Sequence, residues 1–277
     1  MEYIYRKRIS ISTLIFYIIC ILYALLTIVP YLISVLTSIK PVEEATKLSL
    51  NLDKVSLEAY RYIIKEFPFV RWLINSTIVA ICVTAGNLLF NSMAAYALAR
   101  LNFPFKKGIF YIILATMMIP GQVLLVPIYL TLNKFGWIDS YKGLILPWLT
   151  SAFFIFFMRQ YFLTIPKDLE ESALIDGLSR FGIFFKIILP LSGPALAAQA
   201  IFQFVGNWNS FMWPSIIASS EELYTLPVGL NSFYGQYYQF WNQVLAGAIL
   251  LSLPTIVVFV TFQKYFVKGI ATAGLKE

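Results

Sequence analysis

Long apolar runs alternate with short polar segments along the whole chain. A bilayer core of roughly 30 Å is crossed by about 20 helical residues. Six runs reach or approach that length and predict membrane-spanning helices near residues 11–33, 73–98, 108–131, 143–163, 191–217 and 243–264. The fourth reaches it only if Arg159 snorkels or faces the bundle. The pattern therefore predicts an all-α, polytopic membrane protein with six transmembrane helices.

The segment before the last predicted helix, residues 223–241, is apolar but rich in aromatic residues and contains Pro227. It is predicted to be a loop. Three parts of the chain are expected: a first helix with an external segment (1–70), a transmembrane domain of five helices (71–266) and a short tail (267–277).

Composition supports a membrane environment. The chain is 59% hydrophobic and 13% charged, with a mean hydropathy of +0.75, whereas a soluble domain carries about 25% charged residues. A soluble protein of this length could not bury so much apolar surface. The net charge of +7 is spread between the apolar runs, so lipid is the expected surroundings and nucleic-acid binding is not expected.

Candidate chemistry is sparse. The sequence has no histidine, and its two cysteines, Cys20 and Cys82, lie inside apolar runs. Zinc sites and Ser–His or Cys–His catalysis are therefore excluded, and we expect neither catalytic nor metal-binding residues. The apolar stretch from Ile9 to Ile39 is much longer than the core of a secretory signal and has no small-residue cleavage site, so we expect a retained first helix.

Orientation follows from the positions of the basic residues. With the N-terminus inside, 13 of the 21 Lys and Arg but only six of the 14 Asp and Glu fall in inward segments. The positive-inside rule then places both termini in the cytosol. An even number of spans agrees with this.

The longest inward connection, residues 164–190, begins with the marks of a short helix. Pro166 and three acidic residues favour its first turn, and Gly177 is placed for a left-handed C-terminal cap. Ile165, Leu169 and Ala173 recur every four residues and are expected on one face. Such a helix suits docking in a groove of a partner protein, or lies on the membrane surface as an ordinary amphipathic loop helix.

A family resemblance rests on this connection. Glu171-Ser-Ala173, then Gly177, then Ile187-Ile-Leu-Pro190 resembles the Glu-Ala-Ala loop of bacterial importer permeases, with Ser172 as the one departure. The resemblance covers roughly residues 65–277. Further matches are similar to the maltose-type carbohydrate branch, and they comprise Met158-Arg159, Ile165-Pro166, Asp176-Gly177, Trp208-Asn209, Phe266–Gly269 and Ala273-Gly274.

The resemblance implies a permease fold of the type I ABC importer class in the bacterial cytoplasmic membrane, importing a sugar, a di- or oligosaccharide, by alternating access. It implies a coupling helix that binds a cytosolic ABC ATPase dimer, with Glu171 facing an ATPase arginine and Gly177 as a hinge. The implied coupling residues are Leu169, Glu171, Ser172, Ala173, Asp176 and Gly177.

The same resemblance implies a second homologous permease subunit and an extracytoplasmic sugar-binding protein as partners. ATP and Mg are expected on the ATPase, because this chain has no G-x-x-x-x-G-K-[ST] phosphate loop. We expect no cofactor in this chain and no enzymatic activity of its own.

Polar residues inside the spans must face protein or water. They either line a translocation path or hold helices together within the bundle. The candidates for a path are Asn87, Asn91, Gln203, Asn207, Trp208 and Asn209. In the outer segment, Tyr234, Gln236 and Tyr237 either contact the external binding protein or form an interfacial aromatic belt.

Three other functions compete with sugar import. A permease of the same superfamily could carry a non-sugar solute. An ion-coupled secondary transporter would ordinarily need ionisable groups in mid-membrane, but every Asp and Glu lies outside the predicted span centres. An intramembrane enzyme lacks a nucleophile–base set.

Overall fold

The computed structural model describes residues 10–46, 54–237 and 240–274, with side chains at all of these except 232–237 and 265–274. These residues form helices and loops, and no strand occurs among them. The long helices are α1 (Ile11–Ser38), α3 (Phe69–Arg100), α7 (Ala152–Thr164), α11 (Gly193–Trp208) and α14 (Trp241–Gly274). The shorter elements are η1 (Val42–Glu44), α2 (Glu58–Glu66), α4 (Lys106–Thr116), η2 (Gly121–Leu124), α5 (Leu125–Lys134), α6 (Tyr141–Ile145), η3 (Leu146–Trp148), α8 (Asp168–Ile175), α9 (Arg180–Ile183), the π-helical turn η4 (Phe184–Ile188), α10 (Leu189–Leu191), α12 (Met212–Ile217), η5 (Glu221–Leu223) and α13 (Leu226–Tyr237).

The chain divides into two units, residues 1–67 with 233–250 and residues 68–232 with 251–277. In the first unit α1 is apolar and exposed along almost its whole length, which suits a helix surrounded by lipid. Its C-terminal end is fixed by Ser38, whose hydroxyl hydrogen-bonds the Tyr60 hydroxyl at 2.7 Å. The Asn242 side chain donates to the backbone oxygen of Lys40 at 3.1 Å.

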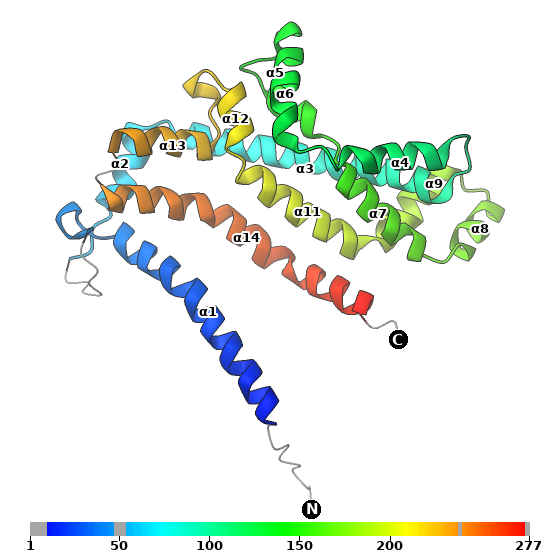
Figure 1. Cartoon of the computed structure of the whole chain (residues 1–277), viewed down its shortest axis with the longest axis horizontal. Helices are drawn as coiled ribbons and strands as arrows, with labels where there is room; N and C mark the ends of the chain where they lie inside the picture. Colours follow the sequence, from blue (N-terminus) through cyan, green and yellow to red (C-terminus); the bar gives the residue numbers. More distant parts are fainter. Residues whose placement is uncertain (1–9, 47–53, 238–239, 275–277) are drawn as a thin grey trace, which may run out of the picture. The chain divides into compact units, whose positions relative to one another are not determined.

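In the second unit α3 is the central helix, and α7 and α11 pack along it (Figure 1). One apolar cluster lies around the C-terminal half of α3 and includes Tyr96, Met158, Phe162 and Phe184. A second cluster lies around its N-terminal half and includes Val83 and Trp213, among others.

The N-terminal end of α3 is held by the segment that precedes α13. Asn75 donates to the backbone oxygens of Glu222 and Tyr224, both at 2.8 Å. The Leu226 amide donates to the Ser76 hydroxyl at 2.7 Å. These contacts satisfy backbone groups that the loop would otherwise bury without partners.

The number of membrane crossings agrees with the prediction. Three helices are long and apolar enough to span a bilayer, namely α1, α3 and the first 24 residues of α14. Three further pairs qualify when each bent pair counts as one span, which gives up to six. The all-α fold class is therefore confirmed.

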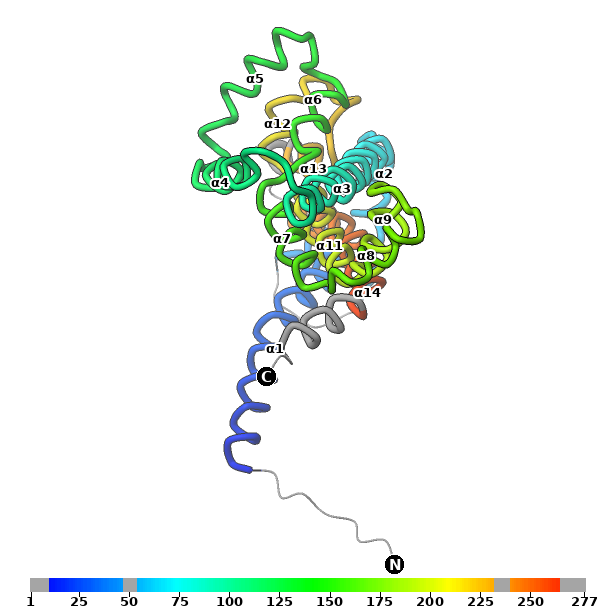
Figure 2. The backbone as a smooth tube through the Cα atoms, turned by 90° about the vertical axis from the view of Figure 1, so that its right-hand side faces the viewer, coloured from blue at the N-terminus to red at the C-terminus, as the bar shows by residue number. Residues whose placement is uncertain are grey.

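The span predicted near residues 108–131 consists of two helical segments with a break between them. Helix α4 ends at Thr116, and the pair from Lys106 to Lys134 bends by 94° (Figure 2). Pro120 has no N–H to continue the hydrogen-bond ladder, and its extended ψ of 128° stops the helix.

The fourth and fifth spans are also interrupted. The pair Tyr141–Trp148 and Ala152–Thr164 bends by 42°, and Arg180–Leu191 and Gly193–Trp208 by 79°. The fifth helix does not continue to residue 217 as expected. It ends at Trp208, and α12 follows as a separate helix from Met212 to Ile217.

The loop expected over residues 223–241 is largely the helix α13. Pro227 is its second residue, where a missing N–H costs nothing. Gly229 packs on the indole ring of Trp72 so closely that a Cβ at this position would overlap the ring. An aromatic-rich sequence with proline and glycine indicated a loop, and tertiary packing against α3 made it helical.

We predict that Gly229→Ala lowers the thermal stability of the detergent-solubilised protein, with a free-energy loss of about 1–3 kcal/mol from overpacking. Trp72 is fully buried and has no room to move away. The matched control is Gly108→Ala in α4, where an added Cβ meets nothing within 4 Å. Equal melting temperatures for the two variants would contradict the close packing of α13 on α3.

Candidate functional site: the cytosolic helix and its anchor

Helix α8 forms where the inward connection predicted it. It begins at Asp168, one residue beyond the N-cap Lys167, with Asp168, Glu170 and Glu171 in its first turn. Pro166 lies just before the cap rather than inside the helix. Acidic side chains in this first turn interact favourably with the partial positive charge at the helix N-terminus.

The C-terminal cap of α8 is a Schellman motif. Gly177 has φ of +81°, its amide donates to Leu174 O at 3.0 Å, and the Leu178 amide donates to Ala173 O at 2.9 Å. Only glycine adopts this left-handed conformation without steric cost. The predicted end of the helix at Gly177 is therefore confirmed.

The faces of α8 differ from the expected stripe. Ala173 is buried against the apolar cluster of the C-terminal half of α3, as is Ile165, which is extended and precedes the helix. Leu169 is exposed instead, and so is Ile175, at 86% of its surface. Ile165 is extended and so lies outside the helical repeat, and within α8 Ala173 is buried while Leu169 is exposed. Ile165, Leu169 and Ala173 therefore do not form the buried stripe that the spacing predicted.

The outward face of α8 carries the remaining predicted coupling residues. Glu171, Ser172 and Asp176 are exposed, and the Ser172 hydroxyl donates to Asp168 O at 2.8 Å within the helix. Together with Leu169 and Ile175 they form a mixed acidic and apolar surface, which we call the outer face of α8. Their role in coupling stays a prediction.

A buried ion pair holds α8 on the C-terminal end of α3. Arg100 Nε lies 2.6 Å from Glu170 Oε1, and the two side chains are only 3% and 6% exposed. The Tyr96 hydroxyl donates to Glu170 Oε2 at 3.2 Å. Arg100 also donates to the backbone oxygen of Ile165. Neither charge could remain buried without the other.

Other basic side chains complete this end of α3. Arg159 Nε donates to Leu98 O at 3.2 Å, and its guanidinium lies 4.1 Å from the centre of the Phe110 ring. Lys106 Nζ donates to Leu101 O at 2.8 Å. These cations donate hydrogen bonds to the free carbonyls at the C-terminus of α3. They also interact favourably with the partial negative charge of that end. Arg159 thus faces the bundle, one of the two arrangements expected for it.

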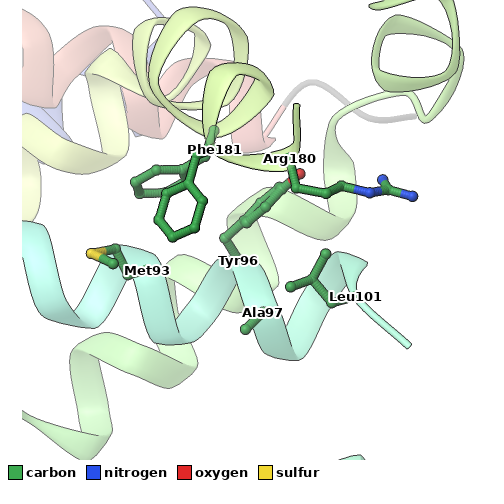
Figure 3. Close-up of a pocket in the computed structure, with 7 residues that line it drawn as sticks. Met93, Tyr96, Ala97, Leu101, Arg180 and Phe181 are labelled. Atoms are coloured by element: carbon green, nitrogen blue, oxygen red, sulfur yellow. The ribbon is translucent and has the colours of Figure 1, made fainter. Parts of the chain in front are cut away.

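A mainly apolar cavity of about 180 Å³ lies beside the ion pair. Figure 3 shows Met93, Ala97 and Leu101 along α3 on one side of the cavity, and Arg180 and Phe181 on the other side. Tyr96 of α3 is directed toward Arg180. Phe184, in the π-helical turn, completes the lining. The segment after α8 thus contacts the same turn of α3 that holds Glu170.

Asparagine side chains of α3 bond the backbone groups that the break in the fourth span frees. Asn87 donates to the backbone oxygen of Trp148, and Asn91 Oδ1 accepts from the Ser151 amide at 3.0 Å. Asn91 also donates to Asn87 Oδ1 at 2.6 Å. A broken helix in a membrane requires such partners for its freed backbone groups. This arrangement favours helix packing for both residues, and a part in translocation stays a prediction.

The predicted path residues of α11 separate into two sets. Trp208 is buried, and its indole N–H donates to Leu251 O at 2.9 Å, while Asn209 is exposed. Gln203 and Asn207 are half-buried and line a cavity of about 240 Å³. We call it the indole–amide pocket, and its lining is Val79, Leu144, Trp148, Gln203, Gly206, Asn207, Ser210, Trp213 and Pro214.

Tyr234, Gln236 and Tyr237 belong to α13, but their side chains lie outside the described residues. Contact with an external binding protein stays a prediction for them.

A family model described as "Binding-protein-dependent transport system inner membrane component" matches residues 87–272. The match includes α8, its anchor on α3 and all residues of the indole–amide pocket except Val79. The chain belongs to this family of permeases. Its members are inner-membrane transport components rather than enzymes, and they work with a solute-binding protein.

Named relatives agree with this. The permease is 38% identical to the arabinooligosaccharides transport system permease protein AraQ of Bacillus subtilis over 91% of this chain and 92% of that protein. It is 37% identical to the sn-glycerol-3-phosphate transport system permease protein UgpE of Pectobacterium atrosepticum over 73% of each chain.

The fold of the permease is similar to a chain from the crystal structure of a bacterial ABC transporter involved in the import of the acidic polysaccharide alginate. The TM-score is 0.83 at 24% identity, and the alignment covers 96% of this chain and 100% of that one. At this identity the likeness shows the fold alone.

Sequence reasoning missed the anchor of α8. Glu170 stood beside Glu171 as one of several acids of a first turn, and Arg100 as one of many inward basic residues. Arg100 ends a long apolar helix, and Glu170 carries the opposite charge in the next inward connection. This combination could have indicated that the two residues pair. Which of two adjacent acids faces inward depends on how α8 docks on α3.

We predict that Asn91→Leu lowers the stability of the permease by about 1–3 kcal/mol, since the Ser151 amide and Asn87 Oδ1 would be buried without partners. Thermal unfolding in detergent measures the loss. Asn133→Leu, an exposed amide on α5, is the matched control and should melt as wild type. A wild-type melting temperature for Asn91→Leu would show that the amides do not support the broken span.

We predict that Glu170→Gln, which leaves Arg100 buried and uncompensated, lowers stability by about 3–5 kcal/mol, whereas Glu171→Gln on the exposed side leaves it unchanged. The double variant Arg100→Met with Glu170→Met should recover most of the loss, because a buried ion pair is replaceable by apolar groups of similar volume. Melting curves of the four proteins decide this. Equal effects of the two Glu→Gln changes would refute the anchor.

Proposed function

We propose that this permease is the membrane subunit of an ATP-driven importer that carries a saccharide, a di- or oligosaccharide, across the cytoplasmic membrane by alternating access. It acts beside a second homologous permease, a cytosolic ABC ATPase dimer that binds ATP and Mg, and an extracytoplasmic sugar-binding protein. Family membership supplies the general transport role, and the partners beyond it belong to the proposal.

The observation that carries the proposal is the rigid attachment of α8 to α3 with an exposed outer face. A helix that couples a partner's motion to the membrane helices must be rigidly attached to them. Here the buried pair of Arg100 and Glu170 and the packing of Ala173 fix α8 to a helix of 32 residues. Closure of an ATPase pair against α8 would therefore move α3 and the helices packed on it as one body.

The outer face of α8 suits a partner protein. Leu169 and Ile175 offer apolar area next to the carboxylates of Glu171 and Asp176. Such a mixture fits a cleft with apolar walls and a basic group. In this proposal Glu171 faces an ATPase arginine, and Gly177 allows the chain to turn after the helix.

The saccharide assignment is supported by the relative aligned over 91% of this chain, which is named for arabinooligosaccharides. The orientation with both termini in the cytosol is supported by the basic residues of the inward segments. It puts α8 on the ATPase side of the membrane.

A permease of the same superfamily for a different solute is the remaining alternative, and the relative named for sn-glycerol-3-phosphate favours it. An ion-coupled transporter has no comparable support. Every Asp and Glu of the sequence lies outside the six span candidates, whereas ion coupling ordinarily uses ionisable groups within them.

We predict that Glu171→Lys abolishes ATP-driven saccharide uptake by the reconstituted complex while the permease remains in the membrane. Like charges opposed across an interface cost several kcal/mol, so uptake should fall by about a hundredfold or more. Gly177→Pro should have the same effect, because proline cannot adopt a positive φ. Uptake and co-purification of the ATPase are measured in parallel.

The control is Glu58→Lys, the same charge reversal at an exposed acid of α2. It should take up saccharide at the wild-type rate. If Glu171→Lys and Gly177→Pro also transport at the wild-type rate, α8 does not couple the permease to its ATPase.

A further inference from the structure

The indole–amide pocket has the composition of a ligand site, and the role of α8 does not use it. It lies between α3, η3 and the ends of α11 and α12 in the second unit. Its lining combines two indoles, two amides and one hydroxyl with apolar walls. Small-molecule sites typically have apolar and aromatic walls with a few polar groups that orient the ligand.

The amides of the pocket have unused hydrogen-bonding capacity. Asn207 donates to the backbone oxygen of Gln203 at 2.8 Å, and within the described residues its Oδ1 accepts from no protein group. The Gln203 side chain and the Ser210 hydroxyl bond to no group in that same part of the protein. Half-buried amides in a membrane-embedded bundle are costly unless water or a ligand satisfies them.

The two indoles of the pocket are held in a fixed arrangement. Trp213 is buried, and its N–H donates to Gly143 O at 3.1 Å. Trp148 packs edge-to-face on it, with ring centroids 5.5 Å apart. Trp213 thus fixes the half-buried Trp148, whose ring offers apolar surface to the C–H face of a ring-shaped ligand.

The pocket contains no charged residue. None of the nine lining residues is Lys, Arg, Asp or Glu. A phosphate or carboxylate held here would be desolvated without a cation, which is costly. Sites for such anions ordinarily provide Arg, Lys or clustered backbone amides. Hydroxyl groups, in contrast, both donate to and accept from amides and serine.

We propose that the indole–amide pocket binds one residue of a neutral saccharide on its way through the permease, with Gln203, Asn207 and Ser210 bonding the hydroxyls and the Trp148 indole covering the ring. The inference rests on the proposed saccharide import and narrows it to uncharged sugars, against glycerol phosphates and acidic sugars. A volume of about 240 Å³ lies below the roughly 300–1,000 Å³ of drug-sized sites, which suits a single sugar ring.

The first test uses the full complex with its ATPase and binding protein in vesicles. Uptake is measured with the fastest substrate among neutral arabino-, xylo- and malto-trioses. Gln203→Leu and Asn207→Leu should each lower kcat/KM by about tenfold, since each removes a hydrogen bond to the sugar. Gln160→Leu, the same change at an exposed amide of α7, should transport as wild type.

The second test bypasses the binding protein. Equilibrium dialysis measures binding to the detergent-solubilised permease complex. It compares a neutral trisaccharide with a trisaccharide of uronate residues and with sn-glycerol-3-phosphate. Wild type should bind the neutral trisaccharide at least about tenfold more tightly than either anion, and Gln203→Leu should weaken binding of the neutral trisaccharide by about tenfold. Equal or tighter binding of an anion overturns the proposal.

The remaining outcomes separate the pocket from the proposed function. If wild type imports a neutral trisaccharide and the two pocket variants import it equally well, the pocket assignment fails and the proposed saccharide import is retained. If the variants lose uptake and also no longer co-purify with a second permease, the pocket residues form a contact with that subunit. The sugar site is then refuted. If wild type imports no saccharide with ATP, both proposals fail.

Discussion

The permease depends on one buried interaction, the ion pair between Arg100 at the end of α3 and Glu170 in α8. An isolated helix of eight residues is unstable in water, because helix nucleation is costly and few backbone bonds follow it. α8 persists because Glu170 and Ala173 are buried against α3 and its neighbours. The same contact leaves Glu171, Leu169 and Ile175 exposed on the other side. The burial of Glu170 beside Arg100 therefore sets how α8 lies on α3 and which of its faces stays exposed.

Helix α3 connects the two ends of the second unit. At its N-terminal end Asn75 and Ser76 bind the segment before α13, and at its C-terminal end Arg100 binds α8. Between them Asn87 and Asn91 support the break in the fourth span. A helix held at both ends and along its middle would move as one body, which is what the proposed coupling to an ATPase requires.

The interrupted spans give the second unit its polar interior. The chain breaks near Pro120, Leu149 and Ser192, and α11 ends at Trp208 before α12 turns away. Each break frees backbone groups that must find partners, and the ends of the broken elements bring Trp148, Gln203, Asn207 and Trp213 around one pocket. The pocket therefore lies where several helical elements end and meet.

The sequence by itself determined the membrane environment, the number of spans and the position of α8, since these follow from the length of apolar runs and from local caps such as Gly177. It also pointed to the family through Glu171, Ala173 and Gly177. The tertiary structure alone decided that Glu170 turns inward and Glu171 outward, that residues 226–237 are helical, and that Asn87 and Asn91 are occupied while Gln203 and Asn207 line a pocket. The physical reason is that hydropathy and capping act within a few residues, whereas the partner of a buried polar group comes from another helix far away in the chain.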